Sequence, residues 1–499
     1  MDLEILLLLA LPLAGGAVLA LVGHRQYAAE INTAFSILTF GAAASLVARV
    51  IAEGSVTALE EQFFVDSLNV FLVALTAFVA MTSSLFSRPY MRIERMHGRV
   101  SDAGMRLYHS MYQLFSFTML LVLTTNNLGI MWVAMEAATL TTVLLIALYR
   151  THASLEAAWK YFILCGVGIA QALFGTILVY FAAERILGAG GVSLLWTHLD
   201  AVKGELEPTV MAIAFVFLLV GYGTKVGLVP LHNWLPDAHA EGPTPISAVL
   251  SGLLLNVALY ALIRFKVITD GALDRPFASA LLMGFGLLSV AVAAFFLSRQ
   301  RDIKRMFAYS SIEHMGLITF AFGMGGPVAS FAGLLHMTVH SLTKSAIFFA
   351  VGHASQKSGT QLMENIRGLV QVSPTIGWGL MLGTAAILGM PPFGVFASEF
   401  LILTTAIAQQ PWAAPVLLIS LGVSFAAIFG KVQGMVFGEM SSSMSGSSGS
   451  MSGSPSAAHL AHRPAMVPAF THLALVLLLG LYVPPYLADW YRRAAQLIG

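Results

Sequence analysis

The sequence predicts an all-α polytopic membrane protein, and this prediction rests on its composition and on the length of its apolar runs. Of the 499 residues, 57% are hydrophobic and only 10% are charged, whereas a soluble domain carries about 25% charged residues. The apolar residues gather in runs of about 20, the length a helix needs to cross a bilayer. These runs are too long, and too uniformly apolar, for the strands of an outer-membrane barrel.

We count fourteen such runs and expect about 14 transmembrane helices. In chain order the runs are 3–22, 31–51, 64–87, 107–126, 128–149, 159–183, 210–228, 243–267, 275–298, 305–322, 328–353, 374–408, 413–437 and 466–490. An even number of crossings leaves both termini on one side of the membrane.

The Lys and Arg residues are divided unequally between the two sides. Of the 26, fifteen follow odd-numbered runs, eight lie in the other loops or the C-terminal tail, and three lie inside or at the edge of runs. Positive residues collect on the cytoplasmic side. We therefore expect both termini outside, which for a multi-pass protein of a bacterial inner membrane is the periplasmic side.

Two of the runs contain prolines beside an ionisable residue. In GTKVGLVPLHNWLPDAH, Pro230 and Pro236 follow Lys225. In LGMPPFGVFASEFLIL, a proline pair precedes Glu399. Proline interrupts a helix, and a broken helix at membrane depth is tolerated only where its free carbonyls face protein or water. Two breaks five helices apart are typical of inverted repeats that form a transport site.

This spacing predicts two inverted five-helix repeats, each containing a broken helix. The expected divisions are an N-terminal three-helix segment with a basic loop (1–106), a first half-channel repeat (107–267), a second, inverted repeat (268–440), a disordered and dispensable Ser/Gly linker (441–465) and a C-terminal helix (466–499).

Glu136 and Lys225 are ionisable residues placed inside apolar runs. A charge at the bilayer centre costs at least about 2.5–3.5 kcal/mol, so such residues face the bundle interior and often mark ion pathways. Their opposite signs predict a coupled pair in which the lysine loads and releases a proton. The alternative is an interhelical salt bridge without a role in transport.

The stretch HMTVHSLTK places His336, His340 and Lys344 four residues apart. On a helix they form one stripe about 12 Å long, and imidazole exchanges protons near neutral pH. We expect a central proton relay that continues to Glu399. The alternatives are histidines that only bond backbone carbonyls and an inert Glu399. We expect no metal site, because this helix offers no suitable third ligand.

Two further residues have weaker claims to a role. Lys431 lies near a membrane interface, where a lysine can extend its amine to the headgroups. His232 lies in the first break, where a solvated turn residue is the simpler interpretation. The single cysteine, Cys165, cannot by itself hold an iron–sulfur cluster. We therefore expect no cofactor on this chain and no binding of nucleic acid.

Several long strings resemble a known family. GTKVGLVPLHNWLPDAHAEGPTPISAVL, RDIKRMFAYSSIEHMG, HMTVHSLTKSAIFF and PPFGVFASEFLIL resemble the antiporter-like proton-pumping subunits of respiratory complex I and of Mrp antiporters. LVLTTNNLGIMWVAMEAATL and SLEAAWKYFILCGVGIAQALFGTILVY resemble the hydrogenase-4 component F family of hydrogenase-4 and formate hydrogenlyase-type complexes. The resemblance implies fourteen helices and the same proton-transfer roles for Glu136, Lys225, His336, His340, Lys344 and Glu399.

The chain departs from the resembled pattern in one predicted helix. Run 243–267 carries Ser251 and Asn256 where pumping relatives often carry a histidine or lysine. Asn256 cannot titrate, so we expect transfer there to depend on water, which puts full pumping competence in doubt.

The leading hypothesis is a proton-translocating membrane subunit of a hydrogenase-4/formate hydrogenlyase-type oxidoreductase. The chain would carry no redox centre, so whether it counts as an enzyme is left open. Its expected partners are protons, the lipid bilayer, other membrane subunits and hydrophilic redox subunits, namely the large and small hydrogenase subunits and iron–sulfur proteins. The alternatives are a subunit of a cation/proton antiporter or inorganic-carbon uptake system without redox partners, and a scaffold that has lost pumping.

Overall fold

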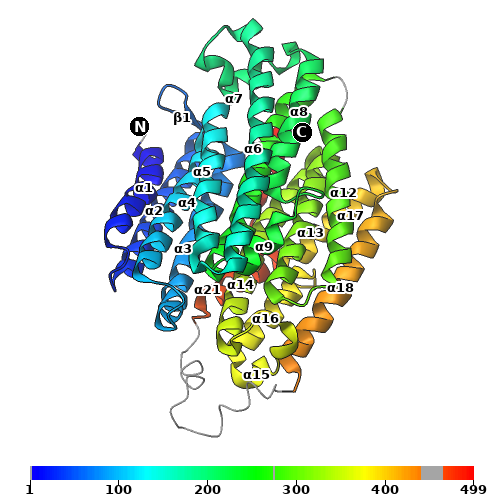
Figure 1. Ribbon diagram of the computed structural model, residues 1–499. Helices are drawn as coiled ribbons and strands as arrows, with labels where there is room; N and C mark the ends of the chain where they lie inside the picture. Colours follow the sequence, from blue (N-terminus) through cyan, green and yellow to red (C-terminus); the bar gives the residue numbers. More distant parts are fainter. Residues whose placement is uncertain (1–2, 274–275, 440–464) are drawn as a thin grey trace.

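The protein is a bundle of long helices that run side by side (Figure 1). The computed structural model describes residues 3–273, 276–439 and 465–499. Within these ranges the only sheet is an antiparallel pair, β1 (Val56–Ala58) and β2 (Phe63–Val65). The predicted predominantly helical membrane architecture is confirmed.

The helices fall into a long set and a short set. The long helices are α1 (Leu3–Val22), α2 (Ala28–Glu53), α3 (Ser67–Met96), α4 (Asp102–Thr124), α5 (Leu128–Ile146), α6 (His152–Leu187), α8 (Pro208–Val226), α11 (Leu255–Ala272), α12 (Phe277–Leu297), α13 (Ile303–Met324), α14 (Gly326–Ser358) and α18 (Ala414–Phe437). The shorter helices are α7 (Trp196–Ala201), α9 (Trp234–Glu241), α10 (Thr244–Val249), α15 (Leu369–Val372), α16 (Pro374–Ile387), α17 (Gly394–Gln409), α21 (Val467–Leu481) and α22 (Pro485–Ile498). A π-helical turn, η4 (Leu250–Leu254), joins α10 to α11, and short 3-10 turns occupy η1 (Ala147–Tyr149), η2 (Gly191–Leu194), η3 (Lys203–Glu205) and η5 (Met363–Asn365).

All fourteen predicted runs coincide with helices, but fewer qualify as spans on their own. Among the described residues, ten helices are long and apolar enough to cross a membrane, or up to 11 if the bent pair α21 and α22 is one span. α16 and α17 fall short because they are the two halves of one interrupted run. α4 and α13 carry more polar side chains. The total of fourteen spans stays a prediction.

The final run differs from its predicted form. We expected one helix over 466–490, and the structure instead has α21 and α22 bent by 82° between Leu481 and Pro485. The two prolines at 484 and 485 explain the bend, because neither can donate the backbone hydrogen bond that would continue α21.

Both predicted helix interruptions are confirmed. α8 ends at Val226 and α9 begins at Trp234, while α16 ends at Ile387 and α17 begins at Gly394. One detail of the prediction is wrong, because Pro236 does not break a helix. It lies in the first turn of α9, where a missing backbone donor costs no intrahelical hydrogen bond.

The centre of the bundle is formed by α14 and by the α10–α11 segment. In the most apolar window of each, 100% of residues are buried, compared with 28% for α18 at the edge of the bundle. α1 and α2 lie at one lateral edge and α18 at the other (Figure 1). The apolar outer helices therefore separate the central helices, which carry the ionisable side chains, from the surface.

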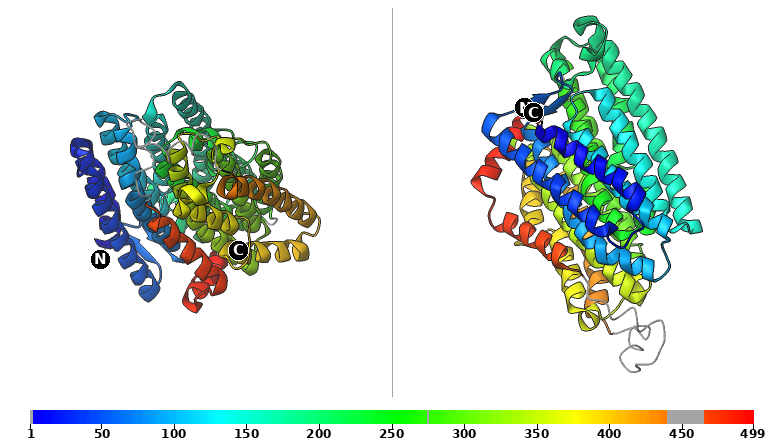
Figure 2. Two further views of the ribbon diagram at one scale, coloured as in Figure 1. Left: turned by 90° about the horizontal axis from the view of Figure 1, so that it is seen from below. Right: turned by 90° about the vertical axis from the view of Figure 1, so that its left-hand side faces the viewer.

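Both termini lie at the same end of the bundle (Figure 2). The C-terminus is tied there by a hydrogen bond of 2.8 Å from the backbone N–H of Gly326 to the carbonyl of Gly499. A shared end agrees with an even number of crossings, while the side of the membrane stays a prediction. The predicted Ser/Gly linker 441–465 lies outside the described residues, apart from its last residue.

A buried ion pair fixes α11 to the start of α3. Arg264 and Lys266 are two of the eight cations that the sequence analysis assigned to the other loops and the tail. That assignment is wrong, because α11 continues to Ala272 and buries both side chains. Arg264 makes two hydrogen bonds of 2.9 Å to Asp66, and its guanidinium lies 4.2 Å from the ring centre of Trp196. The charge is tolerated inside the bundle because its donors are satisfied.

Asp66→Asn should strongly destabilise the protein. Asparagine still caps the N-terminus of α3 as Asp66 does, but it leaves the Arg264 charge uncompensated, which costs about 3–5 kcal/mol. The measurement is the thermal unfolding midpoint of the full chain in detergent. The control is Asp489→Asn, which removes the exposed pair with Arg492 and should change stability by less than about 1 kcal/mol. Equal midpoints for the two variants would contradict this account.

Candidate functional site

Lys225 lies at the end of α8 and is held by a tyrosine on the neighbouring helix. Its Nζ donates a hydrogen bond of 3.0 Å to the hydroxyl of Tyr161 on α6 and lies 4.7 Å from the centre of that ring. The Tyr161 hydroxyl also lies 2.6 Å from Thr142 Oγ1 on α5. A chain of hydroxyl groups therefore leads from the lysine to α5, the helix that carries Glu136.

Glu136 and Lys225 do not touch each other. Within the described part of the chain, no ion pair joins them, and the half-buried Glu136 accepts a hydrogen bond of 3.2 Å from Thr139 instead. Their charges still act on each other across this distance. α6 packs against both α5 and α8, and Tyr161 on α6 contacts Lys225 of α8 and Thr142 of α5. The predicted pair therefore lacks a direct contact, and its coupled role stays a prediction.

The break after Lys225 is closed by an aromatic side chain. Gly227 ends α8 with a positive φ of 81°, a conformation that glycine adopts without strain. Trp234, at the start of α9, donates a hydrogen bond of 2.8 Å from Nε1 to the carbonyl of Thr224, and its ring centre lies 4.8 Å from that of Tyr161. The same indole therefore caps α8 and supports the partner of the lysine.

The predicted relay of α14 is buried at the centre of the bundle. His336, His340 and Lys344 are each 0% exposed. Lys344 Nζ donates one hydrogen bond, of 3.0 Å, to the carbonyl of Phe307. Neither ring nitrogen of His340 has a hydrogen-bond partner among the residues that the structure describes, so this imidazole is free to bind a proton or a water.

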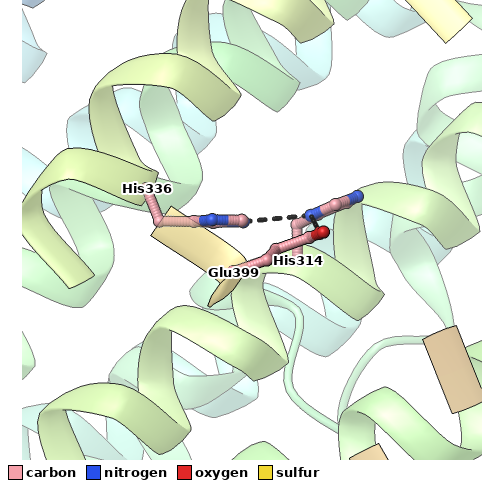
Figure 3. A group of neighbouring side chains, drawn as sticks. All are labelled: His314, His336 and Glu399. Atoms are coloured by element: carbon pink, nitrogen blue, oxygen red, sulfur yellow. Dashed lines mark hydrogen bonds and ion pairs between the residues drawn. The ribbon is translucent and has the colours of Figure 1, made fainter. Parts of the chain in front are cut away.

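His336 is the centre of a contact between three helices (Figure 3). Its Nε2 lies 3.0 Å from Nδ1 of His314 on α13, and its Nδ1 lies 2.8 Å from the hydroxyl of Ser398 on α17. His314 Nδ1 in turn lies 3.7 Å from Glu399 Oε1. The ring of His340 is 5.6 Å from that of His314. The structure therefore brings the histidine stripe and Glu399 together, with His314 between them.

The second break lets a carboxylate lie against the backbone. Gly389 has a positive φ of 62°, and a Cβ built on it would lie 2.0 Å from Glu399 Oε2. A side chain at position 389 would therefore occupy the space of the carboxylate. The prolines that interrupt this helix and the glycine beside them position Glu399 next to His314.

Sequence reasoning missed three residues of this site: Tyr161, Glu313 and His314. The last two lie in IEHMG, inside an apolar run, so their burial was a usable signal. Glu313 lies within electrostatic range of Lys344 and Glu399. His239 of α9 is buried, stacks on Phe348, and senses the charge of Lys344. Nothing in the local sequence singles out Tyr161, because its role depends on the packing of α6 against α8.

α14 alone offers too few ligands for a metal site, but two other helices supply ligands beside it. The ligand atoms of His314, His336 and Glu399 come from three helices and all lie within 4.8 Å of one another. Such an arrangement is a candidate metal site by geometry.

Ser251 and Asn256 join the α10–α11 segment to α13 and α14. Ser251, in the π-helical turn, lies 2.7 Å from Ser311 of α13. Asn256 Nδ2 donates to Ser341 Oγ on α14 at 2.8 Å and to the carbonyl of Met337 at 3.3 Å. Hydrogen-bonded groups therefore occupy this position between the lysines, in place of a titrating side chain.

The two remaining candidates lie at the edges of this network. His232 lies in the first break, with its ring centre 6.2 Å from that of Tyr309. Lys431 binds the end of a neighbouring helix, and its place relative to a membrane interface stays a prediction. Its Nζ donates three hydrogen bonds, of 2.9, 2.9 and 2.8 Å, to the carbonyls of Leu297, Ser298 and Gln300. It therefore caps the C-terminal end of α12.

The similarity to known proteins agrees with this geometry. Residues 125–426 match the family described as NADH:quinone oxidoreductase/Mrp antiporter, TM, which is more than half of the chain. The chain belongs to this family. The matched region of the NADH:quinone oxidoreductase/Mrp antiporter family contains every residue from Glu136 to Glu399 discussed above.

Two kinds of relative of this antiporter family are similar along nearly the whole chain. A hydrogenase-4 component F homolog from Methylacidiphilum infernorum (isolate V4) is 47% identical over 487 residues, 98% of each chain, so the resemblance to hydrogenase-4 component F is confirmed. Among solved structures, a chain of the membrane-bound sulfane sulfur reductase, an archaeal respiratory membrane complex, has a TM-score of 0.86 at 23% identity, covering 100% of this chain and 98% of that one. A chain of the Mrp complex from Dietzia sp. DQ12-45-1b has a TM-score of 0.84 at 20% identity, with coverage of 100% and 98%. These two likenesses establish the fold.

Gly389→Ala should displace the Glu399 carboxylate. The added Cβ would collide with Oε2, and alanine is strained at this positive φ by about 1–2 kcal/mol. We expect a lower thermal midpoint, and a changed infrared carboxyl band that is absent from Gly389→Ala/Glu399→Gln. The matched control is Gly422→Ala in α18, where nothing lies within 4 Å of the added Cβ and alanine favours the helix. An unchanged carboxyl band in Gly389→Ala would refute the contact.

Proposed function

We propose that this chain is the proton-translocating membrane subunit of a hydrogenase-4/formate hydrogenlyase-type complex, in which electron transfer in partner subunits drives proton movement. One observation carries this proposal: buried protonatable side chains gather near both helix breaks, Lys225 at the first and Lys344, three histidines and Glu399 near the second. The 47% identity to a hydrogenase-4 component F homolog supports the type of complex. The chain itself would carry no redox centre.

In this proposal Glu136 and Lys225 form the switch at the start of the path. Lys225 bonds the phenol of Tyr161. Glu136, which carries the opposite charge, lies within electrostatic range of Lys225 but does not touch it. A change of charge near the half-buried Glu136 would alter how strongly Lys225 holds its proton. Tyr161 supplies the hydroxyl through which the proton leaves or arrives. A partner subunit packed against α5 could therefore act on Lys225 without touching it.

The middle of the path would run through Lys344 and the imidazoles. Lys344 is electrostatically coupled to His239 on one side and to His340 and His314 on the other. His340, with no fixed hydrogen bond, is suited to pass a proton between Lys344 and the His314–His336 pair. Water would complete the steps that exceed hydrogen-bond length, including those past Asn256.

Glu399 would be the exit residue. It lies beside His314 and beneath the interrupted segment between α16 and α17, whose residues around the proline pair are partly exposed. Moving one charge against 100 mV requires about 2.3 kcal/mol. A path divided into short steps between neighbouring groups spreads this work, and each step ends on a group that can hold the proton.

The architecture that goes with this function is two inverted repeats within fourteen spans. We place the first repeat at 107–267 and the second at 268–440, between an N-terminal segment (1–106) and, after a linker (441–465), a C-terminal segment (466–499). The two interrupted helices, each beside an ionisable residue, support this division. We further propose the bacterial inner membrane with both termini periplasmic, and membrane and hydrophilic redox subunits, including hydrogenase and iron–sulfur subunits, as partners.

A cation/proton antiporter or an inorganic-carbon uptake system without redox partners is the second candidate function. The TM-score of 0.84 to a chain of an Mrp complex favours considering it. The same buried side chains would serve either function, so partner composition decides between them.

Lys225→Met should abolish proton translocation in assembled complexes. Methionine matches the length of the lysine without its charge, and removing a positioned proton carrier costs about 10²–10⁴-fold in rate. Translocation is measured with a pH-sensitive dye in inverted membrane vesicles, normalised to the amount of assembled complex. Normal translocation in this variant would refute the assignment of Lys225.

Tyr161→Phe should lower translocation by removing only the hydroxyl that Lys225 bonds. The matched control is Tyr222→Phe on α8. Tyr222 is also fully buried, but its hydroxyl has no hydrogen-bond partner among the described residues. We expect translocation to fall in Tyr161→Phe and to be unchanged in Tyr222→Phe. If both variants translocate like the wild type, proton transfer does not pass through the phenol.

Purification of the tagged chain from its native membrane should distinguish the two candidate functions. A redox complex predicts copurified subunits that carry iron and nickel in stoichiometric amounts, measured by mass spectrometry and elemental analysis. A preparation without either metal, whose vesicles exchange Na⁺ for H⁺, would favour the antiporter instead.

A further inference from the structure

Three potential electron-pair donors converge at the contact of α13, α14 and α17 (Figure 3). They are Nδ1 of His314, Nε2 of His336 and Oε1 of Glu399. His314 Nδ1 lies 3.0 Å from the first partner and 3.7 Å from the second. All three residues are buried, so water in bulk does not separate them. The position of the proton on each imidazole decides which ring nitrogens can turn a lone pair to a cation.

The hydrogen bonds of Ser398 favour one tautomer of His336. The Ser398 hydroxyl lies 2.9 Å from the carbonyl of Val395, and a carbonyl can only accept. When the hydroxyl donates there, its oxygen accepts the bond of 2.8 Å from His336 Nδ1–H. The neutral ring carries one proton, so Nε2 of His336 presents a lone pair towards His314.

The backbone of the second break also contacts His314. Its imidazole has a hydrogen bond with the backbone of Ile387, the last residue of α16. When this bond and the Ser398 bond use the ring protons, His314 Nδ1, His336 Nε2 and a Glu399 oxygen all turn lone pairs to the same point. A cation at that point would be bound by all three.

The dimensions of the contact suit a metal ion better than a single proton. A proton bridges two donors in a line, whereas here three donors surround one point. Zinc binds histidine nitrogen and carboxylate oxygen at about 2.0–2.2 Å in tetrahedral geometry, which places ligand atoms about 3.3–3.6 Å apart. The two separations from His314 Nδ1, 3.0 Å to His336 Nε2 and 3.7 Å to Glu399 Oε1, lie on either side of that range.

We propose that His314, His336 and Glu399 form a binding site for a divalent transition metal ion, with Zn²⁺ as its ligand. Ser398 and the Ile387 carbonyl orient the two imidazoles from behind, as outer hydrogen-bond partners do in zinc proteins. The fourth position is open. His340, whose ring lies 5.6 Å from that of His314 and whose nitrogens are unpartnered in the described structure, or a water can fill it.

Two further ionisable groups lie near the contact. Lys344 lies within electrostatic range of His314, and Glu313 lies within electrostatic range of both Lys344 and Glu399. The entry route is the interrupted segment at 388–393, because it is partly exposed and Gly389 touches the Glu399 carboxylate. An ion bound here would occupy the same lone pairs that proton transfer needs. Zinc would then act as a reversible blocker of the path.

The test is zinc binding to the full-length chain in detergent after removal of metals with a chelator. Isothermal titration calorimetry with ZnCl₂ should show a site lost in His314→Gln, His336→Gln and Glu399→Gln, each binding at least about tenfold more weakly. His472→Gln is the matched control, because His472 is a buried histidine on α21 that bonds Thr82 and Leu342. It should bind zinc as the wild type does.

Ser398→Ala makes the test more specific. It keeps all three ligands and removes only the group that favours this tautomer of His336, and we expect zinc to bind about 10–100-fold more weakly. X-ray absorption of the zinc-loaded wild type should show two imidazoles and an oxygen ligand at about 2.0–2.2 Å. This second readout does not depend on how well the variants fold.

Three results would overturn the proposal: no zinc binding by the wild type, equal binding in all the ligand variants, or a spectrum without imidazole. The outcome is separate from that of proton translocation. A chain that translocates protons but binds no zinc refutes only the metal site. One that binds zinc through these residues but does not translocate protons refutes only the proposed function.

Discussion

The cost of placing charge inside a membrane protein governs this structure. A lysine ammonium has three donors, and each donor that lacks an acceptor in an apolar interior raises the free energy of the charged form. The protein answers this cost in two ways. Arg264 and Lys431 have acceptors for their donors, whereas Lys225 and Lys344 each have one hydrogen bond in the described structure. The cations with several acceptors hold helices together, whereas the lysines with one hydrogen bond are those to which we assign proton transfer.

This difference in hydrogen bonding separates the cations that hold helices together from the lysines to which we assign proton transfer. Lys304 belongs to the first class, because it donates to the carbonyls of Ala240 and Gly242 and so caps α9. Lys344 is buried as deeply as Lys304 but differs in its partners, because it has one hydrogen bond in the described structure and its charge acts on imidazoles of α9, α13 and α14.

The sequence predicted the membrane class, the two interruptions and most of the ionisable residues, because these depend on composition, proline and local charge. It could not identify Tyr161 or place His314 beside His336, because those contacts depend on how separate helices pack, which the local sequence does not show. Its wrong assignments have the same origin. Arg264 looks like a loop cation until Asp66, 198 residues away, is seen to neutralise it. The inverted repeats rest on periodicity alone and stay a prediction.

The two breaks use glycine for different purposes, which explains why they lie where they do. At Gly227 the chain turns so that Trp234 can cap the Thr224 carbonyl and support Tyr161, and this break therefore fixes the partner of a lysine. At Gly389 the missing side chain leaves room for the Glu399 carboxylate itself. The first break thus orients a neutral hydroxyl towards a cation, and the second brings an acid against imidazole. Because a continuous helix would bury its carbonyls in its own ladder, neither the Thr224 carbonyl nor that of Ile387 would be free to accept a side-chain donor. Interruption of the helix is therefore what makes the backbone a working part of each site.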